Sequence, residues 1–217
     1  MIKLRAVFEK SGRAKYISHL DLNRCMLRII RRSKLPIWYT EGFNPHPYFS
    51  FALALSLGFE SSCEILDFNL IKEIPYDDVR DKLNEVMPEG MKILSVCEQN
   101  KKITEISKAE YCIKLNTDAP KQLVLDVKML MDQDEIIIEK KTKKGIKNVD
   151  LKPSVEIVKI SSKDNLVNIM MRLPAGTQTN YNPNLFIESL KKTGKASFTT
   201  QNIRRTAILC ENNEIFL

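Results

Sequence analysis

Long apolar runs are missing from this sequence of 217 residues, and so is any recognisable leader. No uninterrupted apolar stretch approaches the roughly 18 residues that a membrane-spanning helix needs. The first residues, MIKLRAVFEKSG, alternate between apolar and polar side chains, whereas a signal peptide would show an apolar block. We therefore expect a cytoplasmic protein.

Cysteine and histidine are both scarce. The five cysteines are odd in number and widely spaced, a pattern that fits neither a disulfide framework nor a metal site of the CxxC type. The two histidines, His19 and His46, lack a third partner and helical ligand spacing. We therefore expect no bound metal and cysteines that serve as small core residues.

Four familiar motifs are also absent: GxxxxGK[ST], GxGxxG after a strand, HExxH and GxSxG. Nucleotide hydrolysis, dinucleotide binding, zinc proteolysis and serine esterase chemistry therefore lack their usual residues. The common enzyme templates do not fit this chain.

The composition that remains is that of a folded globular chain, with 43% hydrophobic and 28% charged residues. The net charge is +7, and residues 101–217 hold most of the excess, with 20 basic and 14 acidic residues against 14 and 13 in residues 1–100. Such a balance is compatible with a polyanionic partner, although alone it indicates only solubility and non-specific attraction.

The hydrophobic pattern repeats one order of elements twice. The first half predicts a strand at 2–10, a helix from about 19 to 34, strands at 48–57 and 63–70, a helix at 75–87 and a strand at 91–98. The second half predicts a strand at 108–116, a helix at 119–131, strands at 135–140, 154–160 and 165–173, a helix at 182–194 and a strand at 204–211. This βαββαβ order is ferredoxin-like. We predict an α+β protein with two tandem ferredoxin-like units, 1–101 and 102–217, the second with an extra strand.

The first predicted helix carries arginines on one face. Ser18 and Asp21 form an N-terminal capping pattern, and Arg24, Arg28 and Arg31 recur at i, i+4 and i+7. Forked guanidinium groups at this spacing suit phosphate oxygens. An ordinary solvated face is the alternative, but only Asp21 is acidic between residues 13 and 34, so the arginines lack local carboxylate partners.

His19 stands at the start of this helix, where backbone amides and the helix dipole favour anions. An imidazole there could also act as a general acid or base. A solvated or capping histidine is the alternative.

The second histidine lies in the loop GFNPHP, residues 42–47. Pro45 and Pro47 fix the backbone around His46, and Gly42 permits a tight turn. Such a loop can present polar and aromatic side chains to a ligand with little loss of entropy. The candidates there are Asn44, His46, Ser50 and Phe51. A purely structural turn is the alternative.

Two further basic stretches are candidates for RNA contact. A predicted hairpin turns at Gly145 and carries Lys141, Lys143, Lys144 and Lys147, which could grip phosphates or simply favour solubility. Arg204 and Arg205 begin the last predicted strand.

Residues 15–70 resemble the N-terminal signature of a bacterial family described as radical-SAM-linked or radical-SAM-associated. The shared features are an SHLDLxR helix start, the GFNPHP loop, a small-apolar segment ending in LG and an acidic-hydrophobic strand, followed later by VDLKP at 149–153 and Arg205-Thr206. Family members occur alone or fused to radical-SAM proteins, so the resemblance implies a radical-SAM partner. This chain lacks CxxxCxxC, so an iron-sulfur cluster and S-adenosylmethionine would belong to that partner and not to this protein.

These observations leave three functions open. We favour an RNA-binding accessory protein without catalysis of its own, which holds tRNA or rRNA across the arginine helix and the GFNPHP loop for a radical-SAM enzyme or another processing or modification machinery. In this hypothesis the stiff loop places Asn44, His46 and Phe51 beside His19. The second is a metal-independent ribonuclease with His19 and His46 as acid and base. The third is a protein adaptor for a radical-SAM enzyme that makes no RNA contact.

Overall fold

Strands and helices alternate along the computed structural model, which describes residues 1–142, 145–177 and 179–217. The first half contains β1 (Ile2–Lys10), α1 (His19–Arg32), β2 (Phe49–Phe51), β3 (Glu60–Leu70), α2 (Tyr76–Asn84) and β4 (Met91–Glu98). The second half contains β5 (Lys108–Asn116), α3 (Pro120–Asp132), β6 (Ile137–Thr142), β7 (Gly145–Asp150), β8 (Glu156–Lys163), β9 (Leu166–Pro174), α4 (Pro183–Thr193) and β10 (Thr199–Leu209). No helix among the described residues is long and apolar enough to cross a membrane.

One large sheet runs through the whole molecule in the order β4-β1-β3-β10-β5-β9-β8, and β2 pairs with β3 beside this path. All neighbouring strands are antiparallel except β3 and β10. The prediction of an α+β protein is therefore confirmed as a mixed fold with a large, mostly antiparallel sheet and four α-helices in the described part of the chain.

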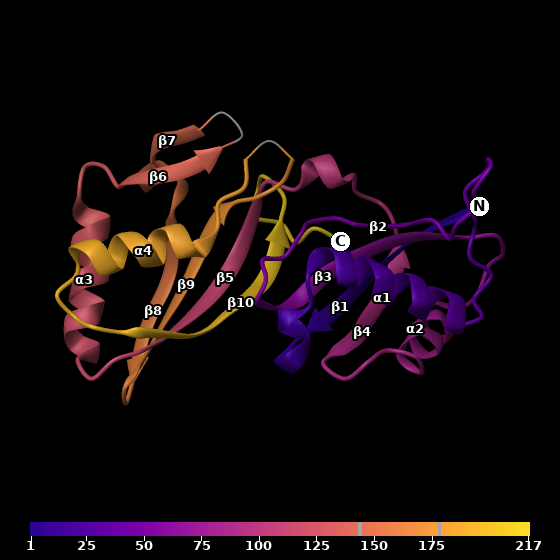
Figure 1. Cartoon of the computed structure of the whole chain (residues 1–217), viewed down its shortest axis with the longest axis horizontal. Coiled ribbons are helices and arrows are strands. Elements are labelled where there is room, and N and C mark those ends of the chain that lie inside the picture. The colour runs from indigo at the N-terminus through magenta and orange to yellow at the C-terminus, as the bar shows by residue number, and fades with distance from the viewer. Residues whose placement is uncertain (143–144, 178) are drawn as a thin grey trace.

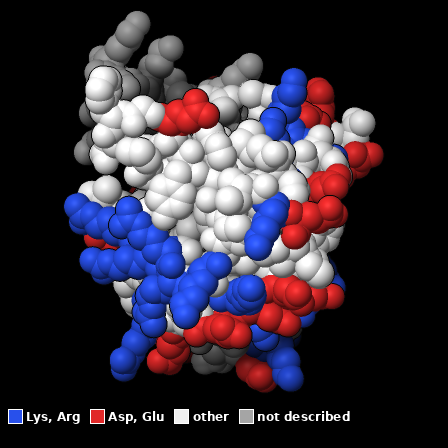
Figure 2. Space-filling view, turned by 90° about the vertical axis from the view of Figure 1, so that its right-hand side faces the viewer, with Lys and Arg blue, Asp and Glu red and all other residues white. Residues whose placement is uncertain are grey.

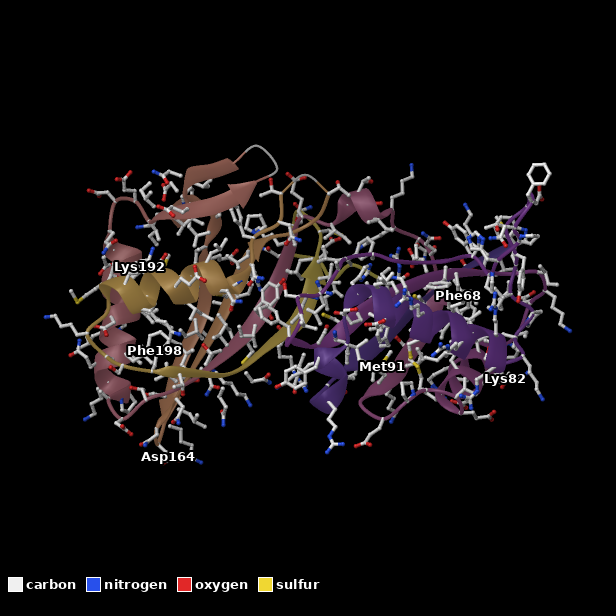
Figure 3. All side chains as sticks on the ribbon, viewed as in Figure 1. Phe68, Lys82, Met91, Asp164, Lys192 and Phe198 are labelled. Carbon is white, nitrogen blue, oxygen red and sulfur yellow. The ribbon has the colours of Figure 1, made fainter. Side chains whose placement is uncertain are left out.

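The helices pack on the sheet in two groups, α1 and α2 in one half and α3 and α4 in the other (Figure 1). Each group covers its own hydrophobic cluster. Phe68 and Met91 belong to the cluster under α1, and Phe198 packs against the cluster of the second half (Figure 3). Two cores on one sheet explain why the sequence pattern repeats.

The two halves meet along β3. The C-terminal part of this strand pairs with β2, whereas Glu60 and Ser61 at its start pair in parallel with Arg204 and Arg205 of β10. Because β2 and β10 pair with different parts of β3, the sheet continues from one half into the other.

The strand predicted at 48–57 is shorter in the structure, because only Phe49–Phe51 forms β2. The chain then leaves the edge of β3 and crosses to the second half. There Ala52 and Leu53 are buried in the core of the second half. The chain is back at the first half by Gly58, whose amide donates to the carbonyl of Lys15 at 2.8 Å. Small apolar side chains fit a buried irregular segment as well as a strand. The sequence pattern alone therefore does not distinguish these two structures.

The second half has two strands more than the first, where one extra strand was predicted. The additional one is β7, which pairs with β6 in a separate two-stranded sheet. Its sequence, GIKNVD, is too polar to show the alternation of a half-buried strand.

Candidate nucleic-acid interface

Helix α1 presents the predicted arginine face. Ser18 caps the helix, since its hydroxyl accepts from the amide of Asp21 at 3.1 Å. Leu22, Met26, Ile29 and Ile30 are buried against the sheet, and the arginines on the other side are exposed. They are Arg24, Arg28, Arg31 and Arg32. Arg32 was not among the predicted contact residues, although it follows Arg31 directly at the end of the same helix.

Only the first of these arginines has an acidic partner. Arg24 lies 3.1 Å from the carboxylate of Asp21, an exposed pair in which a hydrogen bond from Ser18 and another from Arg24 lower the pKa of Asp21. Arg28, Arg31 and Arg32 form no ion pair within the described ranges. Figure 2 views the end of the molecule where α1 terminates, and Lys and Arg side chains gather there on one side of the surface. These three guanidinium groups are available to an anionic ligand.

His19 lies beside Phe51, as predicted. The two rings meet edge to face with centroids 5.6 Å apart, and the Asn23 side-chain amide lies 3.2 Å from His19 Nε2. Both the helix start and β2 contribute to this contact. Ser50 precedes Phe51 in β2, is half-buried, and pairs in register with Asp67.

The GFNPHP loop is held by its own hydrogen bonds. The amide of His46 donates to Thr40 Oγ1 at 3.2 Å, and His46 Nδ1 lies 3.1 Å from both Thr40 Oγ1 and the carbonyl oxygen of Asn44. Gly42 has a φ of +117°, which other residues rarely adopt. Pro47 is buried and forms a bridge with Tyr39, whereas Pro45 is exposed. The loop is stiff, and its histidine also stabilises the turn.

Three aromatic side chains around this loop are exposed: Tyr39, Phe43 and Tyr48, of which Phe43 is fully exposed. Trp38 supports the last of them, with the two ring centroids 5.7 Å apart. None of these three residues is among the ligand contacts predicted from the sequence. The signal was available, since each stands in or beside the stiff loop and no apolar periodicity requires it in a core.

The two histidines do not come together. Among the described residues no hydrogen bond or ring contact joins them. Phe51 follows His46 by five positions along a largely extended stretch, which spans ~16 Å. Of the three loop residues expected beside His19, only Phe51 is there. An acid-base pair of His19 and His46 is therefore not assembled in this structure.

The basic hairpin lies elsewhere. Strands β6 and β7 pair with Lys140 opposite Lys147 and Lys141 opposite Ile146. Lys143 and Lys144 lie outside the described residues. Figure 1 shows the hairpin over the second half, at the opposite end of the molecule from the loop between α1 and β2. The two predicted basic surfaces are therefore separate.

Arg204 and Arg205 face different surroundings. Arg204 is partly exposed and binds the Glu60 carboxylate at 3.1 Å, with Glu9 at 3.6 Å. Arg205 is fully buried and donates to Glu64 at 2.5 Å and to the carbonyl of Leu53 at 2.9 Å. The prediction that Arg205 contacts RNA needs correction, because this guanidinium has no exposed surface and its partners lie inside the protein.

No group of three or more His, Cys, Asp or Glu side chains that could hold a metal ion occurs in the part of the chain that the structure describes. The strongest candidate site is a surface on the end of the molecule where α1 terminates (Figure 1). It consists of the exposed arginines of α1 and the aromatic loop at the same end of the molecule.

Comparisons with known proteins show which family and which solved structures this chain is similar to. A family model described as "uncharacterized protein conserved in bacteria" (DUF2344) matches residues 3–183. A search of curated proteins found no match. A chain of the crystal structure of a Cbf5-Nop10-Gar1 complex aligns with 94% of this chain at 11% identity and a TM-score of 0.51, and this chain spans about half of it, 48%. A CRISPR-associated protein from Thermus thermophilus aligns over 92% of this chain and 100% of its own length, at 10% identity and a TM-score of 0.24.

Proposed function

The chain belongs to the conserved bacterial family DUF2344, and we propose that it is an RNA-binding accessory protein. It would hold structured RNA such as tRNA or rRNA for a radical-SAM enzyme or for other RNA-processing or modification machinery. It would itself catalyse no reaction.

One observation carries this proposal. Arg28, Arg31 and Arg32 are exposed on α1 and have no acidic partner in the part of the chain that the structure describes. Figure 1 shows the C-terminal end of this helix at the same end of the molecule as the loop with the exposed Phe43. Guanidinium groups bind phosphates bidentately, and exposed aromatic rings stack on unpaired bases. A surface that offers both suits single-stranded or loop regions of RNA better than a plain duplex.

The partner assignment rests on the SHLDLxR and GFNPHP motifs, which lie in α1 and the following loop. In this proposal the iron-sulfur cluster and S-adenosylmethionine belong to the radical-SAM partner, and both proteins act in the cytoplasm.

We also propose that the halves, 1–101 and 102–217, are two ferredoxin-like units. The order β4-β1-β3 with β2 beside β3 supports this for the first, and the order β10-β5-β9-β8 supports it for the second, with β6 and β7 inserted.

Fluorescence anisotropy across a salt series tests the proposal, with bulk tRNA against duplex DNA of equal charge. We expect tighter binding to tRNA, with an affinity that falls steeply as salt rises, because released counterions accompany each phosphate contact. Substitution of Arg28 and Arg31 by alanine should lower the salt slope by about two.

The double variant Lys159→Ala/Lys163→Ala is the matched control, since it removes the same charge from exposed positions on β8 at the far edge of the sheet. It should bind tRNA nearly as the unaltered protein does. An equal loss of tRNA affinity in both double variants would show that net charge alone attracts the RNA. No binding to tRNA would refute the proposal and favour a protein adaptor.

A further inference from the structure

A groove of about 340 Å³ runs along α1 on the side that faces the turn after α2. Its helix side consists of Cys25, Arg28, Ile29 and Arg32, and its other side consists of Glu85, Val86, Met87 and Pro88. This volume is within the range of pockets that hold small organic groups. The RNA surface proposed above includes the two arginines of this groove but assigns no role to its other lining residues.

The two arginines of the groove stand one helical turn apart. Residues at i and i+4 are neighbours on a helix, with Cβ atoms ~5–6 Å apart, so Arg28 and Arg32 can hold one phosphate between them. Neither forms an ion pair within the described residues. Arg31 belongs to the same turn but does not line the groove.

The floor between the rims is apolar. Ile29 is buried, and Val86 and Met87 are half-buried against the same core. Burial raises the pKa of Cys25 more than the neighbouring Arg28 lowers it, so the thiol stays neutral and adds to the apolar lining. A flat base fits such a floor, whereas a free inorganic phosphate would leave it empty.

The opposite rim carries one exposed carboxylate, that of Glu85. A carboxylate repels a second phosphate but accepts a hydrogen bond from an exocyclic amino group, as acidic residues do with the amino group of cytosine. The groove therefore offers cations on one rim, an acceptor on the other and an apolar floor between them.

We infer that this groove holds one unpaired nucleotide of the bound RNA, with its phosphate between Arg28 and Arg32, its base against Ile29 and Met87, and an exocyclic amino group on Glu85. This inference rests on the proposed function, because it assigns a subsite to the same RNA surface. It adds to the proposed function a defined position for one unpaired nucleotide and a preference for amino-bearing bases.

Single-site variants of α1 give the first test, with single-stranded oligocytidylate and oligouridylate of equal length as probes. Arg32→Ala should weaken oligocytidylate binding about tenfold, because a hydrogen-bonded ion pair is lost. Arg31→Ala removes the same charge from the same turn outside the groove, and should weaken binding about twofold. Glu85→Ala should abolish the preference for oligocytidylate over oligouridylate.

Cys25 provides a second readout that does not depend on affinity. Its alkylation rate, followed by peptide mass spectrometry, should fall when oligocytidylate binds, while the rate at Cys112 on β5 stays unchanged. An unaltered rate at Cys25, or equal effects of Arg31→Ala and Arg32→Ala, would overturn the inference. If tRNA still binds in that case, the proposed function stands and only the subsite is wrong. If no RNA binds at all, both fail.

Discussion

Arg205 and Arg31 each stand in a pair of consecutive arginines, but the structure gives them opposite surroundings. Arg31 is exposed on α1 and has no acidic partner among the described residues, whereas the Arg205 side chain is 0% exposed and binds Glu64, whose side chain is 3% exposed. Burying a guanidinium without a partner is costly, so an arginine in a core requires a carboxylate and further acceptors there. An exposed arginine has no such requirement, because water solvates its charge. Its N–H groups can therefore donate to a ligand.

The buried pair also joins the two halves of the chain. Arg205 comes from β10, while Glu64 and the two acceptor carbonyls, of Leu53 and Ala54, come from the first half. Burial lowers the pKa of Arg205, but the charge and hydrogen bond of Glu64, together with the nearby Tyr111 and Cys63, outweigh it and raise this pKa above its ordinary value. The guanidinium therefore stays charged, and its bonds to Glu64, Leu53 and Ala54 link the two halves across the seam between β3 and β10.

The largest effect is expected from Arg205→Met. It should lower the free energy of unfolding by about 3–5 kcal/mol, because Glu64 is left in the interior without its ion-pair partner. Urea unfolding followed by circular dichroism measures this loss. The double variant Arg205→Met/Glu64→Met should recover part of it, since no unpaired charge remains. A single variant as stable as the unaltered protein would show that Arg205 is not the link that its contacts indicate.

The contrast between Arg31 and Arg205 also shows which features of the structure could be predicted from the sequence. Helix α1 was predicted as about 19–34 and is found at His19–Arg32, because a capping serine and a regular apolar face are local signals. The contact of His19 with Phe51 also followed from the order of helix, loop and strand. Signals of this kind need only a few neighbouring residues.

The burial of Arg205 could not be predicted in this way. Its partner Glu64 is 141 residues away in the sequence, and only the parallel register of β10 on β3 brings the two together. The crossing segment that supplies Leu53 was itself predicted as part of a strand. The expected position of His46 beside His19 came instead from the stiffness of the GFNPHP loop, which fixes the shape of the loop but not its distance from the start of α1.

An intermediate effect is expected for Glu60, whose side chain is 13% exposed and binds the 36% exposed Arg204. Burial raises the pKa of Glu60, but hydrogen bonds from Asn202, Arg204 and the Gly12 amide outweigh it and lower the pKa below the ordinary 4.5. Glu60→Gln should therefore destabilise the protein by about 1–2 kcal/mol at neutral pH.

The pH dependence tests the same carboxylate. Because the folded-state pKa of Glu60 is lowered, the unfolded state binds its proton first, so the stabilisation is present above pH ~4.5 and is lost as pH falls through the folded value. The difference in unfolding free energy between Glu60→Gln and the unaltered protein should shrink over that range. A difference that is independent of pH would assign the effect to packing and not to the charge.

The smallest effect on stability is expected where both partners are exposed. Arg24 and Asp21 have side chains that are 63% and 60% exposed, so water and salt already screen their attraction. Arg24→Gln leaves the N-terminal cap of α1 intact, because the cap is the hydrogen bond from the Asp21 amide to the Ser18 hydroxyl. The urea midpoint should therefore stay unchanged. The same substitution should lower the salt slope of tRNA binding by about one, since one phosphate contact is lost. Unchanged stability together with a lower slope would place Arg24 with Arg31 as a residue that serves the ligand. A shifted midpoint with an unchanged slope would place it with Arg205, as a residue that serves the fold.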